Sequence, residues 1–233
     1  MRELTDIQSE GDDRKIDIDR VGVSDLSFPL QVRDKARTVQ STVATVCLAV
    51  DLPHHYKGTH MSRFIEVLNS HGSILDVSGM AAIPRELLDR LDAKTARVQF
   101  RFPFFLEKSA PVTGKAGLMD YMVEFEVNAT AEDLDFVVTV EVPVTTLCPC
   151  SKAISERGAH NQRGVVTYSV RFDEPIWIED LVDLVEASAS SPLYSLLKRP
   201  DEKAVTEAAY DNPVFVEDVV RNVAWRSKQQ ENI

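Results

Sequence analysis

Four segments of the chain alternate regularly between apolar and polar positions. The apolar residues fall on every second place over 98–104, 121–127, 136–142 and 166–172. A period of two turns one set of side chains toward a core and the other set away from it, so each segment predicts a β-strand. Less regular strands are expected over 17–32 and 38–51, where Val, Thr and Ile are frequent.

Elsewhere the apolar spacing changes to that of a helix. Apolar residues of the range 61–68 recur at intervals of three and four, and Gly72 follows where this helix is expected to end. A second helix is predicted from the leucines of 87–91, with Pro84 in its first turn.

Further helices are predicted near the C-terminal end. The apolar positions of 178–185 and of 216–223 both follow the helical period. Asn212 and Pro213 are expected to act as the N-cap and first-turn residues of the last helix, because these types favour helix starts. A short helix is expected before it, over 201–210.

The predicted elements form two runs. The first is ββ, αα, ββ over 17–130, and the second is ββ, αα over 131–233, apparently without a closing pair of strands. Residues 1–16 are polar and are expected to form a flexible N-terminal arm. Antiparallel strands with helix pairs between them favour an α+β fold over a doubly wound parallel one. The sequence contains neither a GxGxxG fingerprint nor a P-loop.

The composition limits the kinds of partner. Asp and Glu number 37 against 26 Lys and Arg, which gives a formal charge of −11. Such an acidic composition argues against binding to nucleic acid or to anionic membranes, because both require clustered cations. No apolar stretch is long enough for a membrane span, no secretory signal is expected, and three cysteines are too few for a disulfide framework. We therefore expect a cytoplasmic protein.

The densest group of reactive residues lies between two predicted strands, in TTLCPCSK at 145–152 and ERGAHNQRG at 156–164. Cys148 and His160 offer a thiolate and an imidazole, which suit Zn²⁺ and related ions. A structural zinc site uses four protein ligands, so two or three ligands with an open position fit a catalytic metal better. The alternative is that Cys148 and Cys150 are small buried hydrophobic residues and that His160 is a surface residue.

Cations accompany this group. Lys152, Arg157 and Arg163 lie close together in an otherwise acidic chain. Such charges lower the pKa of a nearby thiol and can bind an anionic substrate. They therefore favour the functional interpretation of the group.

A second cluster, HHYKGTHMSRF, spans 54–64 at the entry to the first predicted helix. Lys57, His60 and Arg63 would lie near the free N–H groups of that helix, where anions are favoured, which predicts a phosphate site. The alternative is that Thr59 caps the helix and that the histidines are solvated. The residues alone leave both interpretations open.

Two carboxylates lie in the first turns of predicted helices near the C-terminal end, Glu202 and Glu217. A carboxylate in this position ordinarily offsets the helix dipole. For Glu217 a second role is open, because a carboxylate can accept two parallel N–H bonds from the edge of a guanine or pterin ring.

Three of these segments resemble the motifs of one enzyme family, GTP cyclohydrolase of type IB. They are LCPCSK at 147–152 with GAHNQRG at 158–164, KGTHMSRF at 57–64, and FVED at 215–218. The resemblance extends from about Arg20 to Ala224, and the first two motifs are long and specific.

This resemblance implies the tunnelling fold (T-fold), in which ββααββ units with antiparallel sheets assemble side by side into a barrel. It implies a homo-oligomer, which we expect to be a tetramer, with active sites at subunit interfaces. The implied reaction is hydrolysis of GTP to 7,8-dihydroneopterin triphosphate and formate, the first step toward folate and other pterins. The family uses a divalent metal, such as Zn²⁺, Mn²⁺ or Fe²⁺.

The resemblance also assigns roles to single residues. It implies that Cys148, His160 and Glu202 bind the metal, with Cys148 and His160 as catalytic residues, and that Glu217 anchors the guanine ring. The role of Cys150 stays open. Five basic residues are candidates for the triphosphate: Lys57, His60, Arg63, Lys152 and Arg163.

One departure from the family concerns the C-terminal end. The family places a further histidine beyond the last helix, and this sequence has none there, so we expect an omitted or truncated tail. Two other functions remain open. One is a related T-fold nitrile reductase with Cys148 as nucleophile, which would need NADPH and no metal. The other is a non-catalytic oligomer that binds a purine or pterin.

Overall fold

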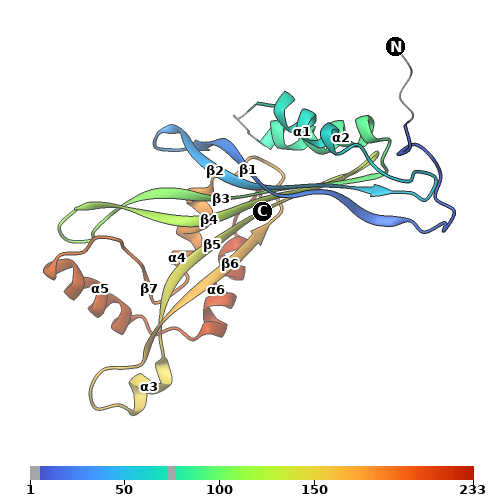
Figure 1. Ribbon diagram of the computed structural model, residues 1–233. Helices are drawn as coiled ribbons and strands as arrows, with labels where there is room; N and C mark the ends of the chain where they lie inside the picture. Colours follow the sequence, from blue (N-terminus) through green and yellow to red (C-terminus); the bar gives the residue numbers. More distant parts are fainter. Residues whose placement is uncertain (1–5, 73–76) are drawn as a thin grey trace. The chain divides into compact units, whose positions relative to one another are not determined.

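The computed structural model describes residues 6–72 and 77–233 (Figure 1). Its strands are β1 (Ile18–Asp34), β2 (Thr38–Leu52), β3 (Thr95–Ser109), β4 (Ala116–Thr130), β5 (Leu134–Leu147), β6 (Asn161–Val170) and β7 (Ser191–Pro192). Its helices are α1 (Met61–Ser70), α2 (Val77–Leu91), α3 (Pro149–Ile154), α4 (Ile178–Glu186), α5 (Arg199–Asp211) and α6 (Val216–Ser227).

The strands follow one another in the sheet in the order of the sequence. The order is β1-β2-β3-β4-β5-β6, and the short β7 pairs with β5. The pairs β1/β2, β2/β3 and β5/β7 are antiparallel. The prediction of an α+β fold with long antiparallel strands is therefore confirmed. The last predicted strand is shorter than expected, because β6 ends at Val170 and does not reach Phe172.

Contacts divide the chain into two compact units, which we describe separately. Unit 1 comprises 1–102 and 124–138, and unit 2 comprises 103–123 and 139–233. The division crosses β3, β4 and β5, so each of these strands contributes residues to both units. The predicted halves, 17–130 and 131–233, follow the order of elements and stay a prediction.

Unit 1 has its core between strands and the helix pair α1 and α2. Figure 1 shows the two helices side by side over one face of the strands of this unit. Phe64 and Leu68 of α1 and Leu87 of α2 are buried, and so are Leu48 and Val98 of the strands. The spacing of the α1 residues is the one that predicted this helix, and Gly72 follows with a φ of 71°.

The start of α2 was predicted wrongly. Pro84 lies inside this helix, which begins at Val77, and not in its first turn. A proline in a helix interior removes one backbone hydrogen bond and crowds the preceding turn. Here the turn before Pro84 carries Met80 and Ile83, which are fully buried, so their burial offsets the cost of the proline.

Unit 2 packs α4 and α6 against each other and α4 against β6. Leu181 and Val185 of α4 and Val219 and Val223 of α6 are buried, as the helical period predicted. Among the described residues, no helix is both long enough and apolar enough to cross a membrane.

The residues before α6 differ from the prediction. Asn212 is the C-cap of α5, and Phe215 is the N-cap of α6, so the expected cap pair Asn212–Pro213 is wrong. The Asn212 side chain instead donates a hydrogen bond to the carbonyl oxygen of Ala189 at 2.9 Å. The Asn212 side chain therefore makes a tertiary hydrogen bond in place of the local one that an N-cap would make.

A buried ion pair joins β3 to α4 in unit 2. The Lys108 ammonium lies 2.6 Å from a Glu186 carboxylate oxygen, and the two side chains are 14% and 10% exposed. Tyr121 donates its hydroxyl hydrogen to Glu186 at 2.8 Å, and Lys108 also donates to the carbonyl oxygen of Leu193 at 2.8 Å. The pair is thus hydrogen-bonded on both sides, as a buried charge requires.

Candidate active site

The loop that carries the first motif lies between β5 and β6 in unit 2, and Figure 1 shows α3 within it. Cys148 follows the last residue of β5, and His160 precedes the first residue of β6. The backbone N–H of Cys148 donates a hydrogen bond to the carbonyl oxygen of His160 at 2.9 Å. The close of the loop therefore brings these two predicted metal ligands side by side.

The surroundings of Cys148 favour its thiolate form. Cys148 is the N-cap residue of α3, and the backbone N–H of Ser151 lowers the pKa of its thiol, while desolvation opposes this effect. The Ser151 hydroxyl and the backbone N–H of Cys150 act in the same direction as the first cause. The pKa of Cys148 is therefore lowered by donors at the start of α3, whereas the sequence suggested that nearby cations would lower it. A thiolate is the form that binds a metal or acts as a nucleophile.

The two cysteines of the motif are not buried hydrophobic residues. Cys148 is half-buried and Cys150 is exposed, so the alternative interpretation of this pair is wrong. Cys47, on β2, is also half-buried. His160 lies on the surface, as that alternative expected, and remains accessible to a ligand.

The third motif lies next to the first. The backbone N–H of Val214 donates to the carbonyl oxygen of Leu147 at 3.0 Å, and these residues directly precede the segments FVED and CPCSK. Glu217 is exposed in the first turn of α6. The structure thus brings the start of α6 to the end of β5, beside Cys148.

Glu202 is exposed in the first turn of α5, and its neighbour Asp201 holds that turn in place. Asp201 is fully buried and accepts hydrogen bonds from the backbone N–H groups of Val112 at 2.9 Å and Thr113 at 2.8 Å. It also accepts from the backbone N–H of Lys198 at 2.9 Å. No sequence motif assigns a role to Asp201. Its position in the first turn of a predicted helix was the available signal.

The structure does not gather the three predicted metal ligands within one chain. Over 6–72 and 77–233, no group of three or more His, Cys, Asp or Glu residues is arranged to hold a metal ion. Cys148 and His160 are adjacent, and Glu202 lies on a different element, α5. The assignment of Glu202 as a metal ligand stays a prediction.

Two of the predicted triphosphate cations lie in unit 2. The Lys152 ammonium donates a hydrogen bond to the carbonyl oxygen of Tyr210 and lies 4.1 Å from the centre of its ring. Lys152 thereby connects α3 to the last turn of α5, where a cation is favoured. Arg163 is exposed on β6.

The other three candidates, Lys57, His60 and Arg63, lie in unit 1, where the described part of the predicted N-terminal arm runs along their loop. The backbone N–H of Lys57 donates to the carbonyl oxygen of Glu10 at 2.6 Å, and the Gln8 side chain donates to Thr59 at 2.8 Å. The Glu10 carboxylate lies 3.9 Å from the Lys57 ammonium. A carboxylate oxygen of Asp6 lies 3.4 Å from His60 Nε2. The arm therefore places carboxylates beside Lys57 and His60.

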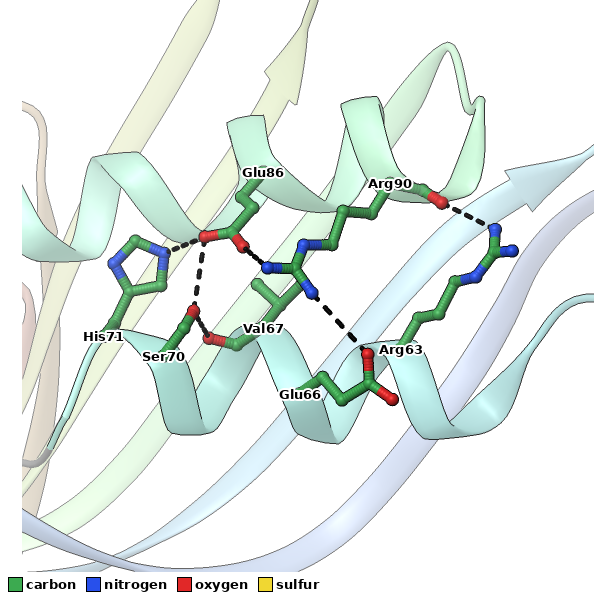
Figure 2. A network of polar contacts seen from close by, with 7 residues as sticks. All are labelled: Arg63, Glu66, Val67, Ser70, His71, Glu86 and Arg90. Carbon is green, nitrogen blue, oxygen red and sulfur yellow. Dashed lines mark hydrogen bonds and ion pairs between the residues drawn. The ribbon is translucent and has the colours of Figure 1, made fainter.

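Arg63 takes part in a network between α1 and α2, shown in Figure 2. Its guanidinium donates to the carbonyl oxygen of Arg90 at 2.7 Å, near the end of α2. The Arg90 guanidinium in turn lies 2.7 Å from a carboxylate oxygen of Glu86 and 3.6 Å from one of Glu66. The other carboxylate oxygen of Glu86 lies 2.7 Å from His71 Nε2. Arg63 thus has a structural contact besides its predicted role. The N-cap of α1 is His60 and not Thr59, so the alternative cap is wrong.

A comparison with protein families decides the affiliation of the chain. A family model described as type I GTP cyclohydrolase folE2 matches residues 4–233. The chain belongs to this family. The affiliation expected from the three motifs is thereby confirmed, and the subdivision IB stays a prediction.

Relatives of similar length carry the family name. GTP cyclohydrolase FolE2 of Akkermansia muciniphila is 65% identical over 231 residues, which cover 98% of this chain and 88% of that protein. The protein of the same name from Methylococcus capsulatus is 55% identical, over 96% of this chain and 83% of its own. That of Geotalea uraniireducens is 49% identical, over 99% and 84%.

A solved structure supports the fold. Uricase from Arthrobacter globiformis matches with a TM-score of 0.50 and 12% identity, over 83% of this chain and 76% of that chain. At this identity the likeness concerns the fold alone. This chain therefore has the tunnelling fold that the resemblance implied.

Proposed function

We propose that this chain hydrolyses GTP to 7,8-dihydroneopterin triphosphate and formate, the first step of folate and pterin biosynthesis. The chain belongs to the type I GTP cyclohydrolase FolE2 family. The observation that carries the proposal is the pairing of Cys148 with His160, beside the segment that leads into Glu217. Residues of the proposed metal and purine sites thus come from segments that lie near the end of β5.

The donors of the loop fit a divalent metal such as Zn²⁺, Mn²⁺ or Fe²⁺. A thiolate and an imidazole are ligands that late divalent ions prefer, and the lowered pKa of Cys148 reduces competition by the proton. We assign Cys148 and His160 to the metal, with Glu202 as a third ligand. When bound, such a metal supplies Lewis acidity toward a water molecule.

Glu217 would hold the purine. Its carboxylate is exposed in the first turn of α6, and it can accept two parallel hydrogen bonds from the guanine edge. Two parallel bonds fix the orientation of a flat ring, so the reacting carbon of the purine would be presented consistently to the loop with Cys148 and His160.

The cations would hold the triphosphate. A guanidinium has five N–H donors and an ammonium three, so the bonds of Arg63 and Lys152 to carbonyl oxygens are compatible with phosphate contacts. Arg163 is exposed on β6, close in sequence to His160. Lys57 and His60 complete the proposed set, and the carboxylates of Glu10 and Asp6 would compete with the substrate for them.

We also propose a homo-oligomer, a tetramer, with active sites at subunit interfaces. Val216 and Val220 are each 66% exposed on one face of α6, on either side of Glu217 in the sequence. Contiguous exposed apolar surface is typical of protein–protein contacts. A partner subunit on this face would lie beside the proposed guanine ligand. The cytoplasmic location stays a prediction.

The interface can be tested by mixing two inactive variants. Cys148→Ala and Glu202→Ala would each be inactive alone. If the two residues meet across an interface, co-expression of both variants forms some sites with both residues intact, so part of the activity returns. Activity that never returns in co-expressed mixtures would contradict a shared site, provided that co-purification of the two variants through different affinity tags shows mixed oligomers.

The reaction itself is tested by incubating the protein with GTP and Mn²⁺ or Zn²⁺. Neopterin fluorescence after oxidation of the product should rise, a chelator should abolish it, and added metal should restore it. Cys148→Ala and His160→Ala should reduce the rate to background. Cys47→Ala is the matched control because it removes a cysteine on β2 outside the motif, and it should keep wild-type turnover.

Other outcomes would favour the alternatives. The lowered pKa of Cys148 also suits a nucleophile, as a nitrile reductase would need. That function predicts consumption of NADPH, insensitivity to chelators and no neopterin. Tight binding of GTP without any turnover, at every metal tested, would indicate a non-catalytic purine-binding protein.

A further inference from the structure

A single hydroxyl joins the two ends of the motif loop. Ser151 accepts a hydrogen bond from the backbone N–H of His160 at 2.7 Å and donates one to the carbonyl oxygen of Cys148 at 3.0 Å. The N–H of Cys148 donates to the carbonyl oxygen of His160 at 2.9 Å. These three contacts close a ring through Cys148, Ser151 and His160. The proposed function uses this hydroxyl only through its part in lowering the pKa of the Cys148 thiol.

The ring restrains both residues from more than one side. Cys148 is held through its N–H by His160, and through its carbonyl oxygen by Ser151 and by the N–H of Lys152 at 3.1 Å. His160 is held through its carbonyl oxygen and its N–H. The backbone of each residue is therefore restrained by more than one bond, and the backbone conformation limits the directions that its side chain can take.

The other serine of the loop shows that this arrangement is particular to Ser151. Ser155 donates its hydroxyl hydrogen to the carbonyl oxygen of Arg157 at 3.0 Å, a contact between residues two places apart. That bond shapes the turn locally and reaches neither Cys148 nor His160. The loop thus offers two serines, half-buried Ser151, which joins the ends, and exposed Ser155, which does not.

We propose that Ser151 is a positioning residue that holds Cys148 and His160 at the spacing a divalent metal needs. The inference rests on the proposed function, in which these two residues are metal ligands. Groups that orient metal ligands commonly change metal affinity by about 10- to 100-fold when they are removed. Because His160 is exposed, water can replace the lost partner of its N–H, so the overall fold should survive the loss of the hydroxyl.

The test measures metal binding by the full-length, metal-free protein. Co²⁺ is titrated into the wild type and into Ser151→Ala, Ser151→Thr, Ser155→Ala and Cys148→Ala. Affinity and the absorption band of the thiolate–Co²⁺ bond are recorded, with circular dichroism as a check on folding. Ser151→Ala should bind about tenfold more weakly and with an altered band. Ser151→Thr keeps the hydroxyl and should restore both, and Ser155→Ala should match the wild type.

The results separate this inference from the proposed function. If Cys148→Ala lowers the affinity and Ser151→Ala leaves affinity and band unchanged, the positioning role is wrong while the ligand assignment stands. If Ser155→Ala weakens binding as much as Ser151→Ala, the loop as a whole matters and the particular role of Ser151 is wrong. If Cys148→Ala binds Co²⁺ like the wild type, the ligand assignment fails, and the inference fails with it.

Discussion

Lys108→Met would measure the contribution of the buried ion pair in unit 2. The substitution removes the ammonium and keeps an unbranched apolar side chain of similar length. Glu186, whose side chain is 10% exposed, keeps its bond from the Tyr121 hydroxyl and loses two contacts to the ammonium at 2.6 and 2.7 Å. The variant therefore leaves a carboxylate in the interior without its counter-charge.

The expected loss is about 3–5 kcal/mol of unfolding free energy, because removal of one partner of a buried pair leaves an uncompensated charge. A matched control exists on α5. There Lys203 lies 2.7 Å from Glu207, with side chains 73% and 58% exposed. Lys203→Met should cost about 0.5 kcal/mol or less, since water solvates the remaining carboxylate. The shortest contacts of the two pairs have nearly the same length, so the expected difference comes from burial and from the additional contacts of Lys108.

Urea denaturation near neutral pH, followed by tryptophan fluorescence, would measure both variants. Trp177 and Trp225 both belong to unit 2, as do the two ion pairs. With a slope of about 2.5 kcal/mol per M urea, the midpoint should fall by about 1–2 M for Lys108→Met and by about 0.2 M or less for Lys203→Met.

A double variant tests the reasoning further. Lys108→Met combined with Glu186→Gln has no buried charge at this place, and Gln can still accept the Tyr121 hydrogen bond. It should be more stable than Lys108→Met alone, although it departs further from the native sequence. A loss below about 1 kcal/mol for Lys108→Met, or a double variant less stable than the single one, would refute the argument from uncompensated charge.

Three further predictions concern pH and substrate. Burial raises the pKa of Asp201, but the hydrogen bonds from Thr113 and its neighbours outweigh burial and lower it. The stability that Asp201 contributes is therefore present above about pH 4 and is lost as the pH falls below it. Asp201→Asn should reduce the difference between the urea midpoint near pH 7 and the urea midpoint near pH 3. Burial raises the pKa of Tyr121, so stability should fall as pH rises above about 10, and Tyr121→Phe should flatten that fall in alkaline urea titrations. Glu10→Gln removes a carboxylate beside Lys57, so the KM for GTP should fall about twofold in steady-state assays; a higher KM would mean that the arm assists binding.

Regular patterns were enough to predict most elements of the fold. The alternation over 98–104 and 121–127 predicted strands correctly, because a period of two follows from the strand geometry itself. In contrast, α3 could not be predicted, since this six-residue helix buries no side chain and so has no apolar stripe. The predictions for Pro84 and Asn212 were wrong because tertiary contacts outweighed local preferences. For Pro84 this was the burial of the preceding helical turn, and for Asn212 it was the hydrogen bond to Ala189.

The candidate site divides in the same way. Residue types and their order along the chain identified the family and pointed to Cys148, His160 and Glu217, because those types determine which ligands can be bound. The tertiary structure decided that the backbone of Cys148 pairs with that of His160, that Ser151 joins them, and that Asp201 anchors α5 through donors about ninety residues earlier in the chain. The sequence alone determines what each side chain can do chemically. Which partner it meets depends on where the folded chain returns, and for Asp201 that partner lies on a distant turn that no local pattern marks.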